Sequence, residues 1–270
     1  MNYQSDTMER TQHLQRVLLH MIKEIDALCR EHNIHYYLLG GSALGAIRHK
    51  GFIPWDDDLD IIMDRENYDR FITMCKSHLD SNKYYIQEAL TDWPLAFSKI
   101  KLKGTSLIEY EGYDDGRGNG IYIDVFRFDN VVRNKFLAHW QYFCGKVYLC
   151  YTLSQRTYDS ANLKKRLLMA LSFPLKLSFV RKVFWRQITK YNKKPQYNYG
   201  MFFGRGNYRT AVVERRIFGT STYLPFEDTV LPLPEQYHEY LSQTFGNYMQ
   251  LPPEEKRQGL HCISVDFGEY

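Results

Sequence analysis

The sequence lacks long hydrophobic runs, low-complexity segments and internal repeats. No uncharged apolar stretch reaches the roughly 18 residues that a membrane-spanning helix requires, so we expect no transmembrane segment. The opening residues, MNYQSDTMERTQHLQ, also lack the apolar centre of a secretory signal peptide. These absences lead us to expect a protein of the cytoplasm or of the inner face of the membrane.

Cysteine is scarce and scattered. The five cysteines are odd in number, and none stands in a CxxC pair or in another spacing typical of zinc ligands. This pattern excludes a disulfide scaffold and a structural zinc site of known spacing. We therefore expect reduced thiols, which also fits a cytoplasmic protein.

A large excess of one charge is missing too. The net charge is only +4, which does not indicate nucleic-acid binding, and we expect no nucleic-acid partner. Aromatic residues, in contrast, make up 16% of the chain, with 22 Tyr and 16 Phe. Tyrosine suits stacking against sugars or bases, and it suits an aromatic-rich core equally well.

Helical and strand patterns alternate in the first half of the chain. Apolar residues recur every three or four positions over residues 10–32, which predicts a helix. Glycine and proline at Gly51 and Pro54 separate the next segments. We predict a second helix over residues 65–79 and strands over residues 36–39, 59–63, 84–87, 97–102, 106–110 and 120–126.

After about residue 130 the pattern becomes helical, aromatic and basic. Two long helical segments are predicted over residues 134–151 and 162–191, with Pro174 breaking the second. The stretch LLMALSFPLKLSFVRKVFW, residues 167–185, is apolar and cationic. It suits peripheral association with an anionic membrane surface, and packing of a helix on its own domain explains it as well.

Four aspartates crowd into IPWDDDLDIIM, residues 53–63. If a strand begins near Asp58, then Asp58 and Asp60 share one face, while Leu59 and Ile61 point into the core. Adjacent carboxylates repel one another unless a cation neutralises them, and a hard divalent ion such as Mg²⁺ suits such oxygen ligands. Asp56 lies a further two residues before Asp58, so it would share their face and stand beside the pair. Asp57 would point to the other face.

Two further features complete a possible site. Asp124 is the only charged residue in GIYIDVF, residues 120–126. A lone aspartate in a strand is often structural. The aspartates of residues 53–63, however, favour the interpretation that Asp124 is a further ligand of the same metal. Gly40, Gly41 and Ser42 follow a predicted strand and open a helix. Such a turn lets a phosphate approach free N–H groups, although it also occurs without any ligand.

Three stretches resemble motifs of the LicD family. They are LLGGSALGAIRHKGFIPWDDDLDIIM (residues 38–63), GIYIDVF, and LPLPEQYHEYLSQTFGNYMQLPPEEKRQGLH (residues 231–261). The resemblance spreads over nearly the whole chain, but we recognise no part of it in residues 130–200. The family shares the nucleotidyltransferase fold and is related to fukutin-related proteins.

The resemblance implies an α+β fold with a nucleotidyltransferase-like mixed sheet, flanking helices and a helical aromatic and basic insertion. It implies a catalytic core over residues 1–130, a helical acceptor or membrane-proximal region over residues 131–200, and a segment over residues 201–270 that completes the catalytic domain. The oligomeric state stays open.

The implied activity is a metal-dependent phosphotransferase that uses Mg²⁺, with Mn²⁺ as the alternative ion. It would move phosphocholine, or a related alcohol phosphate, from CDP-choline or a similar CDP-alcohol to a lipid-linked glycan such as teichoic acid or lipopolysaccharide, releasing CMP. The alternative is a nucleotidyltransferase that moves NMP to a small molecule or macromolecule. A non-enzymatic glycan-binding protein with a decayed site is disfavoured because all three acids are present.

The resemblance also assigns roles to single residues. Asp58, Asp60 and Asp124 become the catalytic metal ligands, with Asp56 beside them. The expected substrate contacts are Gly40, Gly41, Ser42, Arg48, Lys99 and His261.

Overall fold

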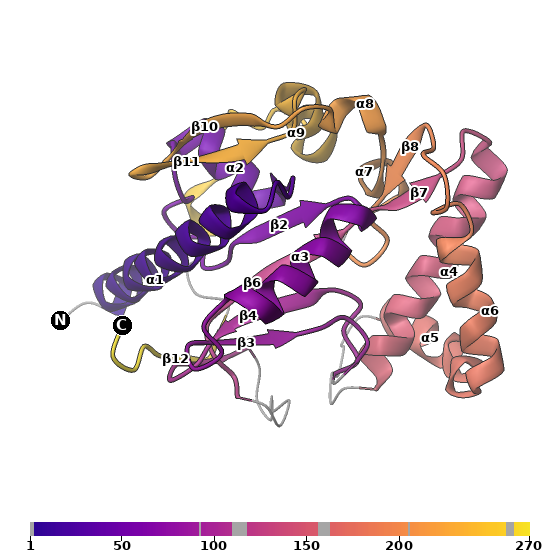
Figure 1. Ribbon diagram of the computed structural model, residues 1–270, viewed down its shortest axis with the longest axis horizontal. Coiled ribbons are helices and arrows are strands. Elements are labelled where there is room, and N and C mark those ends of the chain that lie inside the picture. The colour runs from indigo at the N-terminus through magenta and orange to yellow at the C-terminus, as the bar shows by residue number, and fades with distance from the viewer. Residues whose placement is uncertain (1–2, 92, 110–117, 156–162, 205, 258–261) are drawn as a thin grey trace. The chain divides into compact units, whose positions relative to one another are not determined.

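The computed structural model describes residues 3–91, 93–109, 118–155, 163–204, 206–257 and 262–270. The chain divides into two compact units (Figure 1). The first comprises residues 1–87, 98–126 and 217–270, and the second comprises residues 88–97 and 127–216. The predicted α+β class is confirmed, while the division at residues 130 and 200 stays a prediction.

A five-stranded sheet forms the centre of the first unit. Its order is β1 (Tyr37–Leu38), β2 (Asp60–Met63), β6 (Tyr122–Arg127), β4 (Ser98–Leu102) and β3 (Tyr84–Gln87). The β1–β2, β3–β4 and β4–β6 pairs are antiparallel. Apolar residues of these strands fill the core, and Leu59 and Ile61 are buried as predicted.

Three helices accompany this sheet: α1 (Tyr3–Glu31), α2 (Gly40–His49) and α3 (Arg65–His78). The apolar face of α1 is buried, as its three- and four-residue periodicity predicts. Helix α3 begins at an Asp64 cap, whose side chain accepts from the backbone N–H of Asn67. Figure 1 shows α3 in front of the sheet with α1 beside it, and the two helices contact each other.

The carboxyl-terminal residues return to the first unit. Strands β10 (Thr222–Phe226) and β11 (Thr229–Leu233) form a hairpin, and α9 (Tyr237–Phe245) packs on α2. In the chain, the short helix α8 (Arg215–Phe218) precedes these elements and the short helix η2 (Glu254–Lys256) follows them. The last strand, β12 (Ser264–Asp266), pairs with β5 (Ser106–Ile108). Segments more than a hundred residues apart therefore share this unit.

The second unit combines helices with a small sheet. Its helices are α4 (Lys135–Ser154), α5 (Leu163–Leu171), η1 (Phe173–Lys176), α6 (Ser178–Thr189) and α7 (Tyr208–Ala211). Pro174 lies in η1, so the predicted break is confirmed. The sheet β7 (Asp129–Val131), β8 (Asn198–Gly200) and β9 (Val212–Glu214) was not predicted.

Two other expectations can be checked against the structure. All five cysteines are free, and four of them are buried, as expected for reduced thiols. Within the described ranges, no helix combines the length and the apolar character needed to cross a membrane.

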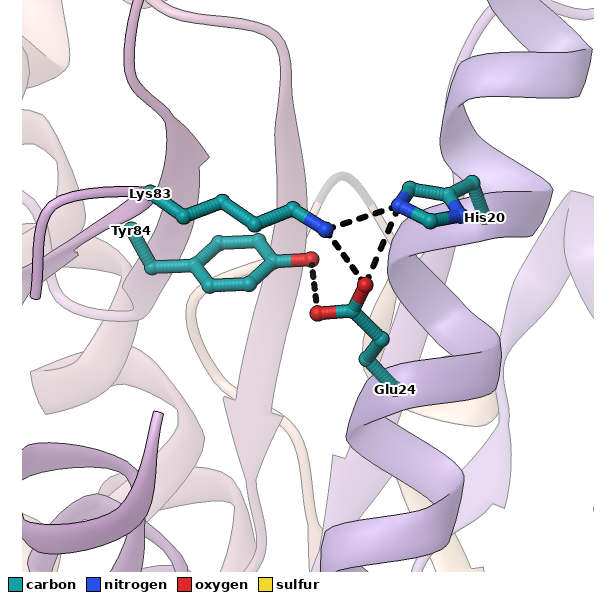
Figure 2. A network of polar contacts seen from close by, with 4 residues as sticks. All are labelled: His20, Glu24, Lys83 and Tyr84. Carbon is teal, nitrogen blue, oxygen red and sulfur yellow. Dashed lines mark hydrogen bonds and ion pairs between the residues drawn. The ribbon is translucent and has the colours of Figure 1, made fainter. Parts of the chain in front are cut away.

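A polar network ties α1 to the edge strand β3 (Figure 2). The Tyr84 hydroxyl donates to Glu24 Oε2 at 2.9 Å, and the Lys83 ammonium pairs with Glu24 Oε1. His20 Nε2 lies 3.0 Å from the same Oε1. Burial acts to raise the pKa of Glu24, but the bonds from Lys83 and Tyr84 outweigh it and lower that pKa below its usual value of 4.5. The folded state thus favours the carboxylate form of Glu24.

We expect Glu24→Gln to destabilise the protein at neutral pH and to do so less in acid. A depressed folded-state pKa contributes stability above the unfolded value, and this contribution is lost as pH falls through the folded pKa. Urea unfolding at about pH 7 and about pH 4 measures the effect. The control is Glu31→Gln on the same helix, where the described residues provide no ion pair for Glu31. A penalty that does not shrink in acid would contradict this account.

Candidate active site

Neighbouring strands bring the predicted acids together. Asp60 is the first residue of β2, and Asp124 lies in β6, which is next to β2 in the sheet. The Asp124 N–H donates to the Leu59 carbonyl at 3.1 Å, which fixes the two segments in register. Strand β2 begins at Asp60, two residues later than the start near Asp58 that the sequence analysis assumed. Exposed Asp58 and half-buried Asp56 therefore join the cluster from the preceding loop.

Burial and mutual repulsion together disfavour negative charge on the acids of this cluster. Burial raises the pKa of Asp60 well above its usual range, and the charges of Asp58, Asp124 and Asp56 add to the rise. Burial likewise raises the pKa of Asp124 to about 7, against the opposing charge of Lys99. The different roles that the sequence predicts for the four aspartates of the motif stay predictions.

Lys99 is the internal counterion of the cluster. It lies on β4 directly opposite Asp124 in the strand register. Its ammonium donates to Glu109 Oε1 at 2.6 Å and lies 3.7 Å from Asp124 Oδ1. The same ammonium stands 3.2 Å from the centroid of the Tyr122 ring, and the Lys99 side chain is buried. Lys99 is therefore engaged by its own unit, and its predicted contact with a substrate phosphate stays a prediction.

The donor chemistry of the cluster suits a hard divalent cation. Asp124 Oδ1 is buried and accepts no hydrogen bond from any described residue. Carboxylate oxygens are the kind of ligand that Mg²⁺ prefers, and a bound cation would reduce the repulsion between them. However, no three His, Cys, Asp or Glu side chains in the described part of the chain stand together in an arrangement that could hold a metal. The cluster thus supplies suitable atoms without a finished coordination shell, and Mg²⁺ stays a proposal.

The first turn of α2 faces this cluster. The predicted Gly-Gly-Ser turn is itself the start of the helix, since α2 begins at Gly40. A methyl group at Gly41 would stand 2.7 Å from Asp56 Oδ2, and Gly40 has a φ of +54°, which favours glycine. Small residues here let carboxylates approach the positive end of the helix, which stabilises nearby negative charge.

Two polar bonds fix this turn in place. The Gly40 N–H donates to the Tyr240 hydroxyl at 3.0 Å, and the Asp60 N–H donates to Ser42 Oγ at 2.9 Å. Tyr240 comes from α9, and the sequence argument did not single it out. Its only signal was its place inside the family-like segment at residues 231–261. The phosphate contacts proposed for Gly40, Gly41 and Ser42 are untested by this geometry.

Cationic and aromatic groups lie near the acids. Arg48 Nη1 donates to the Tyr248 carbonyl at 3.1 Å. Burial and the charge of Arg257 lower the pKa of Arg48, while Asp56 opposes them. The Arg257 guanidinium lies 5.5 Å from the Trp55 ring centroid. The sequence argument missed Arg257 and Trp55, although Trp55 immediately precedes the aspartates; His261 lies outside the described residues.

We expect Asp60→Asn to raise the melting temperature in EDTA. The substitution keeps the shape of the side chain and removes one of the repelling carboxylates. A gain of about 1 kcal/mol would correspond to roughly 2–4 °C for a chain of this size. Asp57→Asn, the same chemical change on a buried neighbour, should give no such gain. Differential scanning calorimetry of both variants makes the comparison, and a lower melting temperature for Asp60→Asn would contradict the repulsion argument.

Comparison with known proteins finds a matching family model and several similar proteins. The model of the LicD/FKTN/FKRP nucleotidyltransferase domain matches residues 33–164, so the match extends through α4 into a region that the sequence motifs had left out. The chain is similar to the lipopolysaccharide cholinephosphotransferase LicD of Haemophilus influenzae, with 29% identity over 92% of this chain and 94% of that protein. Uncharacterized proteins of Rickettsia prowazekii and Rickettsia typhi each show 48% identity over 44 residues, 16% of this chain and 16% and 14% of theirs. Residues 33–164 therefore match the nucleotidyltransferase domain of the LicD family, and the similarity to a LicD protein extends over nearly the whole chain.

Proposed function

We propose that the protein transfers phosphocholine, or a related alcohol phosphate, from a CDP-linked donor to a sugar hydroxyl of a cell-surface glycan and releases CMP. The observation that carries the proposal is the carboxylate cluster at the first turn of α2, in a chain similar over 92% of its length to a lipopolysaccharide cholinephosphotransferase. Lipopolysaccharide and teichoic acid are the acceptor classes we propose. The reaction would take place in the cytoplasm or at the inner face of the membrane.

Phosphoryl transfer depends mainly on positioning and on neutralising charge. Asp58, Asp60 and Asp124 would hold Mg²⁺, or Mn²⁺ in its place, with Asp56 in support. When bound, the ion supplies positive charge for the donor diphosphate and the departing CMP. The protein's own contributions are the carboxylates, the N–H groups of the first turn of α2, and the cation Arg48.

We propose two further roles for residues at this site. Asp124 is our candidate for accepting the proton of the attacking hydroxyl, because its Oδ1 accepts no hydrogen bond within the described structure. Trp55 is our candidate for stacking on the cytosine base, since it lies beside the acids and aromatic rings stack on bases readily. Arg257, held near the Trp55 ring, would add positive charge for the diphosphate.

A second candidate reaction uses the same acids. The matching family model is described as a nucleotidyltransferase domain, which favours transfer of NMP to a small molecule or macromolecule as the alternative. With CDP-choline as donor, phosphocholine transfer leaves choline phosphate on the glycan and releases CMP. Nucleotidyl transfer would instead leave CMP on the acceptor and release phosphocholine. The fate of the two halves of the donor therefore separates the two reactions.

We expect choline label, and not cytidine label, to enter the glycan. The full-length protein would be incubated with Mg²⁺, glycan acceptor and CDP-choline carrying label either in choline or in cytidine. Chromatography should then show labelled CMP in solution and labelled choline on lipopolysaccharide or teichoic acid. Cytidine label on the acceptor would support the nucleotidyltransferase alternative. Release of neither half would count against both reactions on these acceptors.

We expect Asp58→Asn and Asp60→Asn each to reduce kcat by about 100-fold or more, because each removes a carboxylate needed to hold the cation. EDTA should abolish activity in the unmodified protein, and added Mg²⁺ should restore it. The matched control is Asp57→Asn, which should keep kcat within about threefold. Circular dichroism would check that each variant is folded. Full activity of Asp60→Asn would rule out the metal-site assignment.

A further inference from the structure

Helix α4 of the second unit carries an apolar stripe that its own core does not cover. Phe136, Trp140 and Phe143 recur at steps of four and three residues, so they share one face of the helix. All three are exposed, Phe136 to 80%. With His139 they line a shallow apolar depression. The opposite face of α4, including Ala138 and Cys144, is buried in the core of the unit.

The next helices continue this pattern. Leu163, Leu167 and Leu171 recur every four residues along α5 and are exposed, Leu163 to 79%. Phe173 and Phe179, in and after η1, are exposed as well. Figure 1 shows α4, α5 and α6 in one region of the second unit, and α4 contacts both α5 and α6. Their mutual packing uses other residues, such as the buried Leu175 and Ile188.

The same region concentrates positive charge. Residues 130–197 contain 14 of the 35 Lys and Arg of the chain and only one of its 31 Asp and Glu, Asp159, which lies outside the described residues. Among the described side chains of these helices, the exposed cations are Lys135, Arg166, Lys176, Lys182 and Arg186. None of these five forms an ion pair with a described residue. The Lys176 ammonium lies 4.8 Å from the Phe173 ring, so charge and apolar surface are interleaved.

We propose that the exposed apolar and basic surface of α4, α5, η1 and α6 docks on the surface of an anionic phospholipid bilayer. Aromatic and leucine side chains would enter the boundary of the acyl region. Lysine and arginine would keep their heads among the anionic headgroups, with their stems lying along the apolar surface. The inference uses only the second unit and does not depend on the transfer reaction.

The positive charge of this surface favours an anionic bilayer over a second copy of the chain as its binding partner. Self-association through this surface would bring two strongly basic faces together, and like charges facing each other across an interface are costly. A nucleic acid would be attracted to the cations, but binding to phosphates does not require a row of exposed leucines. An anionic bilayer satisfies the apolar and the cationic groups together. A patch of this kind on the surface of a protein commonly marks a site of interaction.

Co-sedimentation of the full-length protein with lipid vesicles tests the proposal. We expect binding to vesicles of equal parts phosphatidylcholine and phosphatidylglycerol, and much weaker binding to phosphatidylcholine alone. High salt should weaken the binding, because it screens the headgroup charge. The double variants Phe136→Ser/Phe143→Ser and Phe173→Ser/Phe179→Ser should each weaken binding about tenfold or more, since each removes two inserted rings.

A matched control distinguishes binding through this surface from nonspecific binding through any exposed apolar residue. Ile263, in the first unit, is 63% exposed, close to the 65% of Phe179, and Ile263→Ser should bind vesicles like the unmodified protein. Circular dichroism would confirm that both double variants are folded, and serine replaces residues that are already exposed. Loss in one double variant alone would support docking through those helices. No binding to the anionic vesicles, or unchanged binding in both variants, would overturn the proposal. So would a dimer in solution that the variants dissociate, because it would assign the surface to self-association.

Discussion

Repulsion between carboxylates is the constraint around which the first unit is organised. Neighbouring strands hold Asp60 and Asp124 close together, and the preceding loop adds the charges of Asp58 and Asp56. Few local features reduce this repulsion: the ammonium of Lys99 opposes it, and the positive end of α2 faces it. A chain that folds around such a cluster sacrifices stability there, as functional sites commonly do.

Residues around the cluster hold its side chains and the first turn of α2 in position. Lys99 is shared between Asp124 and Glu109, so its position on β4 is fixed by two carboxylates and the Tyr122 ring. Tyr240 reaches the first turn of α2 from a helix 200 residues later in the chain. Replacing Lys99 by a neutral residue would therefore leave a buried carboxylate without its counterion, which is a costly kind of change.

Sequence patterns predicted the parts of this fold that depend on local periodicity. The helix α3 and the strand β3 were predicted correctly because their apolar spacing is set within one element. The pairing of β2 with β6 was anticipated only through the chemistry of their aspartates, since two carboxylates seldom complete a cation site. Tyr240, Arg257 and the sheet around β8 escaped prediction. Each depends on contacts between segments far apart in sequence, which no local pattern encodes.

The net charge of +4 conceals how unevenly the charges are distributed. Outside residues 130–197 the chain has 21 basic and 30 acidic residues, whereas that segment alone has 14 basic and one acidic. The average over the whole chain therefore does not reveal that one region is strongly cationic. The two proposals together would explain this division. A basic, apolar surface would concentrate the protein where a lipid-linked acceptor resides, which raises the effective concentration of that acceptor. The acidic cluster, in contrast, would need a bound cation before it could receive a negatively charged donor.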